Sequence, residues 1–148
     1  MEYVWNDGGR IAAGYRGRAG DCVTRAIAIA TRQPYQQVYD DLFAAQREWS
    51  ETSRSRAAKA ARGKASPRNG VHMPVIRAYL AGLGWEWTPT MSIGSGTTVH
   101  MRKEELPSGR LIVSLSRHLC AVINGVVHDV GDPTRDGTRC VYGYWREP

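Results

Sequence analysis

One cysteine in this sequence occupies a position that favours nucleophilic chemistry. Cys22 follows the turn-forming pair Gly20–Asp21 and begins an apolar run that continues to Ala30, which predicts a buried helix starting at Cys22. The N–H groups and the dipole at the start of a helix favour a thiolate over a thiol. Asp21 is expected to cap this helix, because its carboxylate can accept hydrogen bonds from the unpaired N–H groups of the first turn.

A cysteine nucleophile needs an imidazole within hydrogen-bonding reach and a third polar group that orients the ring. Asn124–Gly125 separates two apolar runs, 119–123 and 126–130, and both residues tolerate the positive φ of a tight hairpin turn. With a two-residue turn, His118 and Asp129 share one face of the hairpin and lie diagonally opposite each other. We therefore predict Cys22, His118 and Asp129 as a catalytic triad.

Two other residues of the hairpin region are alternatives for the third position. Asp132 follows the flexible Gly131 and can replace Asp129 if a bulge shifts the register. His128 points to the opposite face from His118 and is the weakest choice. Each member of the predicted triad also has a purely structural interpretation. For Cys22 this is a packing role, since a free cysteine is often buried.

The elements that must position these residues change along the chain from helical to extended. Helices are expected first and antiparallel strands second, which together make an α+β domain with a central buried helix packed on a C-terminal antiparallel sheet. The helices are predicted over 22–31, 35–49 and from Pro74 to Gly82 or Gly84, and the strands over 85–88, 97–101, 110–115, the hairpin and 140–145.

Length and composition fit one soluble domain over residues 1–148. The chain has 148 residues, of which 42% are hydrophobic and 23% charged, enough for one core. It shows no membrane-length apolar run and no signal-peptide pattern at its start, so we expect a cytoplasmic protein that does not enter a membrane. Three cysteines without CxxC spacing, and no HExxH pattern, indicate reduced thiols, with no metal site and no cofactor.

The net charge of +6 arises from one segment, at about residues 50–69. It has no large apolar residue, so an exposed helix extension or a mobile loop is expected there. Its basic residues can bind an acidic partner or nucleic acid through phosphates, although no aromatic residue lies among them to stack on bases. These residues are Arg54, Arg56, Lys59, Arg62, Lys64 and Arg68.

The Gly-Asp-Cys-Val sequence at residues 20–23, the hairpin at 118–129 and the Asp-Pro pair at 132–133 resemble the papain-like cysteine peptidase fold. The similarity is to C39-like peptidases and, more loosely, to NlpC/P60 cell-wall hydrolases. The small single-domain form with Gly-Tyr-Trp at 143–145 also resembles phage and prophage proteins of this clan. The resemblance covers about a third of the chain and implies that Cys22 is the nucleophile, His118 the base and Asp129 the orienting acid.

The chain departs from the papain pattern at the oxyanion site. Papain-type enzymes place a glutamine shortly before the cysteine to donate to the oxyanion, whereas the first glutamine here is Gln33. The Cys22 N–H can provide one donor. The second is expected from the residues before the helix, with Asn6, Arg16 and Arg18 as the choices.

Two hypotheses of function follow. The first is a thiol hydrolase, a peptidase or amidase, that works through an acyl-enzyme; an acyl transferase would use the same residues. The second is a catalytically inactive binding protein on the same fold, whose basic segment contacts an acidic partner or nucleic acid. The absence of a glutamine before Cys22 motivates the second.

Overall fold

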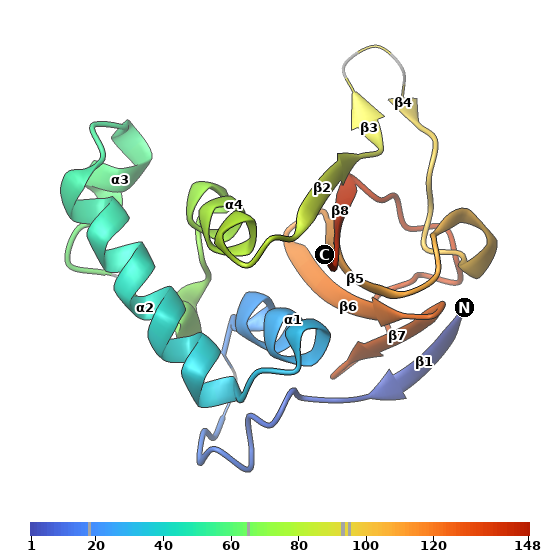
Figure 1. Ribbon diagram of the computed structural model, residues 1–148, viewed down its shortest axis with the longest axis horizontal. Coiled ribbons are helices and arrows are strands. Elements are labelled where there is room, and N and C mark those ends of the chain that lie inside the picture. The colour runs from blue at the N-terminus through green and yellow to red at the C-terminus, as the bar shows by residue number, and fades with distance from the viewer. Residues whose placement is uncertain (18, 65, 93, 95) are drawn as a thin grey trace.

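The computed structural model describes residues 1–17, 19–64, 66–92, 94 and 96–148 (Figure 1). The helices are α1 (Cys22–Thr31), α2 (Tyr35–Thr52), α3 (Arg56–Ala61) and α4 (Met73–Gly82), with short 3-10 turns η1 (Pro67–Asn69) and η2 (Lys103–Glu105). The strands are β1 (Glu2–Trp5), β2 (Glu86–Pro89), β3 (Met91–Ser92), β4 (Gly96–Thr97), β5 (Arg110–Leu115), β6 (His118–Ile123), β7 (Val126–Asp129) and β8 (Gly143–Arg146). The chain is therefore α+β, as its sequence predicts.

The main sheet has six strands in the order β1-β7-β6-β5-β8-β2 (Figure 1). The expectation of a wholly antiparallel, C-terminal sheet is wrong in one respect. β1, from the start of the chain, pairs in parallel with β7, so that Trp5 lies opposite Asp129. This pairing joins residues more than a hundred positions apart, which no local pattern could indicate. β3 and β4 form a separate two-stranded ribbon.

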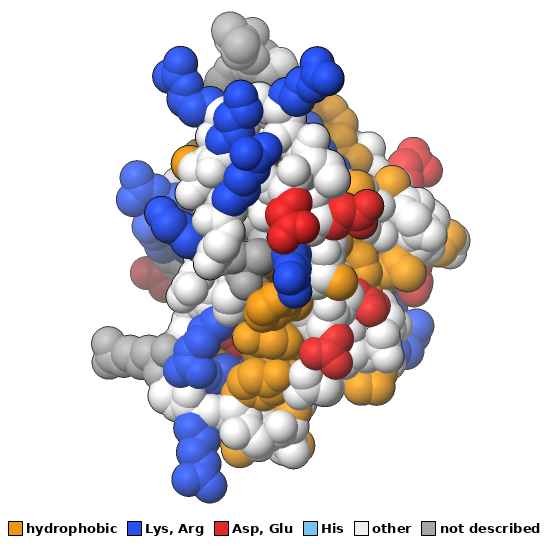
Figure 2. Space-filling view, turned by 90° about the vertical axis from the view of Figure 1, so that its left-hand side faces the viewer, with side chains coloured by type: hydrophobic (Ala, Val, Ile, Leu, Met, Phe, Trp, Pro, Cys, Tyr) orange, Lys and Arg blue, Asp and Glu red, His pale blue; other side chains and the backbone are white. Residues whose placement is uncertain are grey.

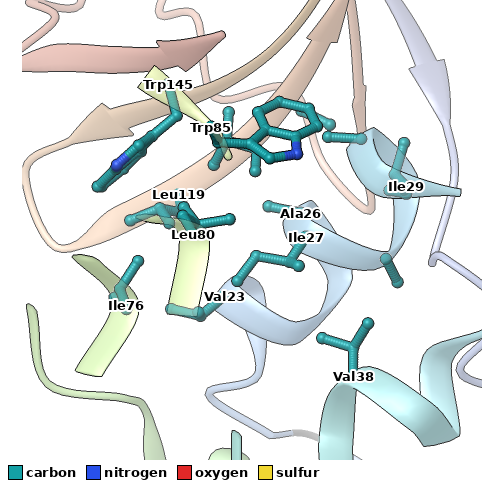
Figure 3. Close-up of a cluster of buried hydrophobic side chains, with 14 of the residues drawn as sticks. Val23, Ala26, Ile27, Ile29, Val38, Ile76, Leu80, Trp85, Leu119 and Trp145 are labelled. Carbon is teal, nitrogen blue, oxygen red and sulfur yellow. The ribbon is translucent and has the colours of Figure 1, made fainter. Parts of the chain in front are cut away.

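Helix α1 packs between the sheet and α2 (Figure 1). Every residue from Val23 to Ala30 is buried, which explains why this stretch is apolar on nearly all sides. Side chains from α2, α4 and the sheet, among them Val38, Leu80 and Trp145, surround α1 (Figure 3). The helix that begins with Cys22 is thus held in place by the main hydrophobic core.

The β6–β7 hairpin has the geometry that its sequence predicts. Asn124 and Gly125 both have positive φ, at 48° and 77°, and Ile123 pairs with Val126 across the turn. One face of β5 and β6 packs on α1 through residues such as Ile112 and Ala121, and the other face contributes to a second apolar cluster. The register fixes which hairpin residues reach the site.

Two predicted strands differ from the observed ones. The stretch predicted as a strand at 97–101 contributes only its first residue to β4, and His100 forms a single bridge with Cys140. The side chain of Glu105 accepts hydrogen bonds from the backbone N–H of His100 and contacts its ring. Backbone hydrogen bonds from the Met101 N–H to the Arg139 carbonyl and from the Val141 N–H to the Val99 carbonyl flank this bridge. The closing strand begins at Gly143 rather than at Cys140.

The basic segment forms α3 and η1 and packs partly against α2. Ser55 caps α3 by accepting a hydrogen bond from the Ala58 N–H, and the side chain of Ala58 is fully buried. The Arg62 guanidinium donates to the carbonyl of Ser50 at the end of α2. The segment is thus more than an exposed extension of α2. Figure 2 views the molecule from the left-hand side of Figure 1 and shows Lys and Arg side chains gathered on the upper part of that face.

Candidate active site

Cys22 is the first residue of α1, and its side chain is half-buried at the end of the sheet where β6 begins. It lines a pocket of about 370 Å³ together with His118 and the segment that follows η1. The His118 side chain and the backbone N–H of Leu119 lie within hydrogen-bonding reach of the thiol. The predicted position of Cys22 at the head of a buried helix therefore holds.

Asp21 does not cap α1, contrary to expectation. Its backbone has φ −103° and ψ 23°, and its side chain makes no capping hydrogen bond. The buried carboxylate instead pairs with Arg25, accepts a 2.6 Å hydrogen bond from the hydroxyl of Tyr35 and lies 3.1 Å from Nε of Arg10. Stronger donors from three other positions have replaced the helix N–H groups as its partners.

His118 joins Cys22 to Asp129. Its Nε2 lies 2.6 Å from Oδ2 of Asp129, which leaves Nδ1 to face the thiol. The second carboxylate oxygen, Oδ1, accepts a 2.7 Å hydrogen bond from the Val130 N–H. Asp129 is nearly buried, with 4% of its surface exposed, so this hydrogen bond is shielded from water. The three residues form a continuous chain from carboxylate to sulfur.

The environment of Cys22 favours its thiolate. Burial raises the pKa of the thiol, but the hydrogen bonds from His118 and Leu119 and the charges of His118 and Arg25 outweigh burial. The net result is a Cys22 pKa below the usual range for a cysteine. A low thiol pKa beside an imidazole is the condition for a reactive cysteine.

The environment of His118 favours its imidazolium. Burial lowers the pKa of the ring, but the hydrogen bonds to Asp129 and Cys22, together with their charges, raise the pKa to about 9. The two shifts run in opposite directions. Both shifts favour a thiolate–imidazolium pair over a neutral thiol and imidazole, and the imidazolium is lost as pH rises through about 9.

Of the alternatives for the third position, neither lies at the site. Asp132 accepts hydrogen bonds from the N–H and hydroxyl of Thr134, at 2.9 and 2.7 Å, and these bonds lower its carboxyl pKa. His128 contacts Asn6, with Nδ2 of the amide 3.2 Å from Nδ1 of the ring. The register of the hairpin thus brings Asp129, rather than Asp132 or His128, to His118.

Two of the three predicted oxyanion donors, Asn6 and Arg16, are engaged away from the pocket of Cys22. Asn6 uses its amide on His128 and accepts from the Gly8 N–H. Arg16 has an exposed side chain, and its carbonyl accepts from Arg10 and Arg68. Arg18 lies outside the described residues.

Asn69, which sequence reasoning missed, lines the same pocket as Cys22. The carbonyl of Arg68 accepts a 2.8 Å hydrogen bond from the Gly20 N–H, and this bond fixes η1 beside the turn before Cys22. The Asn69 side chain is exposed. No local pattern marked this residue, because it lies in a stretch without apolar periodicity, 47 positions after the cysteine in numbering.

The floor of the pocket is mostly apolar. Ile76 from α4 and Leu115 and Leu119 from the sheet are buried there, with 2%, 3% and 5% of their surfaces exposed. Val71 and Met73 are half-buried on the side towards α4. The exposed Arg117 also lines the pocket. The sulfur of Cys22 therefore borders a depression suited to an apolar group.

The remaining cysteines differ from Cys22. Cys120 is buried, and burial raises the pKa of its thiol. Cys140 is half-buried and forms the bridge with His100. Within the part of the chain that the structure describes, no group of three potential metal ligands comes together, and no helix is long and apolar enough to cross a membrane.

Two of the six basic residues at 54–68 donate hydrogen bonds to backbone carbonyls within the protein. Arg62 binds the carbonyl of Ser50, and Arg68 binds the carbonyl of Arg16. Binding of an acidic partner or nucleic acid by this segment stays a prediction from its charge.

Comparison of the chain with protein-family models, with curated proteins and with solved structures finds no significant match. The site itself is therefore the basis for a functional proposal.

Proposed function

We propose that this protein is a papain-like cysteine hydrolase that cleaves a peptide or amide bond through an acyl-enzyme. The observation that supports this most strongly is the hydrogen-bonded chain from Asp129 through His118 to Cys22. This hydrogen-bonded series joins residues from α1, β6 and β7 at the end of the sheet where β6 begins. Nucleophile, base and orienting acid in this order are the arrangement that thiol acyl transfer requires.

In the first half of the reaction, the Cys22 thiolate attacks the carbonyl carbon of the substrate and forms a C–S bond. His118 then gives its Nδ1 proton to the departing nitrogen as the C–N bond breaks. In the second half, His118 takes a proton from water, whose oxygen attacks the thioester and releases the carboxylic acid. Asp129 holds the ring through Nε2 in both halves. An amine in place of water would make the same site an acyl transferase.

The tetrahedral intermediate needs hydrogen-bond donors for its oxyanion. We assign one to the backbone N–H of Cys22, at the free N-terminus of α1. The second is the side-chain amide of Asn69, because this residue borders the same pocket and its turn is tied to Gly20. This assignment replaces the donors expected from the residues before α1.

Asn69→Ala is expected to lower kcat by roughly 10- to 10³-fold with little change in KM, because the amide acts mainly on charge that develops in the transition state. Steady-state kinetics on a cleaved peptide measures both constants. Asn6→Ala is the matched control: it removes a side-chain amide that binds His128 rather than lining the pocket. Equal effects of the two substitutions on kcat would contradict the assignment.

The pocket indicates the substrate class. Its buried floor of Ile76, Leu115 and Leu119 offers no charged partner, so an aliphatic or aromatic group next to the scissile bond fits it best. Burial of such a group in place of water would contribute about 1.5–3 kcal/mol of binding. We therefore expect substrates with an apolar side chain beside the bond that is cut.

Iodoacetamide is expected to label Cys22 ahead of Cys120 and Cys140 at pH 6.5, by roughly tenfold or more over Cys120. The reason is the low pKa of the Cys22 thiol set against the raised pKa of buried Cys120. Peptide mapping by mass spectrometry after short exposure gives the three rates. His118→Gln removes the hydrogen bond and charge that favour the thiolate, so labelling of Cys22 at this pH should slow.

His128→Gln is the control for that substitution, since His128 contacts Asn6 and not the thiol. It should leave the labelling rate of Cys22 unchanged. Hydrolytic activity has a different upper limit from labelling, because proton donation to the leaving group needs the imidazolium. Activity should fall as pH rises through about 9, the pKa of His118. Slower labelling of Cys22 than of Cys140 would count against the proposed function.

A further inference from the structure

A buried network of charges extends from the proposed triad into α1. Arg25, three residues after Cys22, points one guanidinium nitrogen at Oδ1 of Asp21 and places the other 3.6 Å from Oδ1 of Asp129. The exposed fractions of the three side chains are 10%, 2% and 5%. The proposed mechanism uses only Asp129 of these, so the role of the other two is open.

We propose that Arg25 is a positioning residue, held by Asp21, which fixes the Asp129 carboxylate towards His118 and ties this pair to the helix that carries Cys22. The inference rests on the proposed function, since it concerns the orientation of the same triad.

The contacts of Asp129 divide between its two oxygens. Oδ2 binds His118, whereas the partners of Oδ1 among the described residues are the Val130 N–H and Arg25. The Val130 N–H belongs to the next residue, so its hydrogen bond is local and does not tie Asp129 to another element. Arg25 is the partner that reaches Oδ1 from another element. Its loss would leave the direction of Oδ2 poorly defined.

Arg25 is itself held by the carboxylates of Asp21 and Asp129. Its Nε is buried without a hydrogen-bond partner among the described residues, so its polar contacts are the two carboxylates. Asp21 is fixed from its other side by the hydroxyl of Tyr35 and by the charge of Arg10. A buried guanidinium between two buried carboxylates is costly to disturb, because removal of one partner leaves a charge unpaired.

The position of Arg25 in the sequence explains how it can serve the nucleophile as well. Residues three and four apart on a helix lie on the same side, so Cys22, Arg25 and the preceding Asp21 share one edge of α1. The charge of Arg25 lowers the pKa of Cys22. One side chain thus orients the acid of the triad and favours the thiolate.

The neighbouring groups that also influence these charges come from several elements. They are His118 and Cys120 on β6, Tyr3 on β1, Tyr35 on α2, and Asp21 and Arg10 before α1. Arg139 and Asp132, in the loop between β7 and β8, act on Cys120 and Tyr3 rather than on the network itself. Of these, His118 is the group whose hydrogen bond and charge lower the Cys22 pKa alongside Arg25.

The test compares Arg25→Met with Arg110→Met. Arg110 donates to the carbonyls of Ala30 and Ile29, so it braces the opposite end of the same helix without contacting the triad. Both substitutions remove a partly buried arginine that packs on α1, and circular dichroism and thermal melting check that each variant folds. The readouts are the rate of Cys22 alkylation against pH and the low-field proton resonance of the His118–Asp129 hydrogen bond.

Arg25→Met is expected to slow alkylation of Cys22 at pH 6 by roughly fivefold, because a smaller fraction of the thiol is ionised without the nearby cation. The low-field resonance should weaken or disappear. Arg110→Met should change neither readout, whatever its effect on melting temperature. An unchanged alkylation profile and an intact resonance in Arg25→Met would overturn the proposal.

Arg25→Lys tests the bridge if Arg25→Met fails to fold. Lysine keeps a charge near Cys22, but its single ammonium group cannot hold two carboxylates as the planar guanidinium does. Alkylation should then stay close to that of the unmodified chain while the low-field resonance weakens; an intact resonance would overturn the bridging role. Neither readout needs a substrate, so lack of turnover by the unmodified chain would refute the proposed function without deciding this one.

Discussion

Cys22→Ala is expected to reduce cleavage of a peptide substrate by roughly 10³-fold or more, to the level of a protein without a nucleophile. Alanine keeps the start of α1 apolar and removes only the half-buried sulfur, so folding should be preserved. A library of peptides with apolar residues at varied positions, analysed by mass spectrometry, identifies the substrate first. The initial rate of the variant is then compared on the best sequence.

Cys140→Ser is the matched control for this experiment. It also alters a half-buried cysteine, but one that lies in the bridge with His100 rather than beside His118. Its cleavage rate should stay within about twofold of the unmodified chain, as for a substitution away from the reacting atoms. Retention of cleavage by Cys22→Ala would rule out the acyl-enzyme mechanism. A chain that cleaves nothing would favour the binding-protein hypothesis instead.

The sequence was sufficient for the parts of the site that depend on local rules. A nearly continuous apolar run predicted α1 because burial on all sides leaves few polar residues. The Asn124–Gly125 turn fixed the register of the hairpin, and alternation of side chains then placed Asp129 near His118. These predictions succeeded because each needed only residues within about a dozen positions of one another.

Other features depend on contacts that no local pattern contains. Asp21 looked like a cap, but Tyr35 and Arg10 reach it from positions that only the folded chain brings together. The parallel pairing of β1 with β7 is equally remote. Asn69 lies beside the pocket because the hydrogen bond from the Gly20 N–H to the Arg68 carbonyl holds its turn there. In each case the deciding partner lies outside any window in which periodicity can be read.

The hydrogen bond between His118 and Asp129 also carries a large predicted effect. Asp129→Asn keeps the shape of the side chain but replaces an anion with an amide, which cannot stabilise the imidazolium and can donate towards Nε2. A histidine held with its proton on Nδ1 cannot accept a proton from the thiol or from water, so kcat should fall by roughly 10²- to 10⁴-fold. Asp129→Asn would also remove the hydrogen bond and the charge that raise the His118 pKa. The pKa of His118 should then drop, so the alkaline loss of activity should occur below pH 9.

Asp132→Asn decides between the two aspartates that the sequence left open. Asp132 binds Thr134 within its own loop, so its substitution should leave kcat within about twofold and act mainly on that loop. Measurement of kcat for both variants over pH 5 to about 10 separates the cases, because only Asp129 touches the titrating ring. A large loss in Asp132→Asn with normal turnover in Asp129→Asn would mean that the hairpin shifts its register when substrate binds.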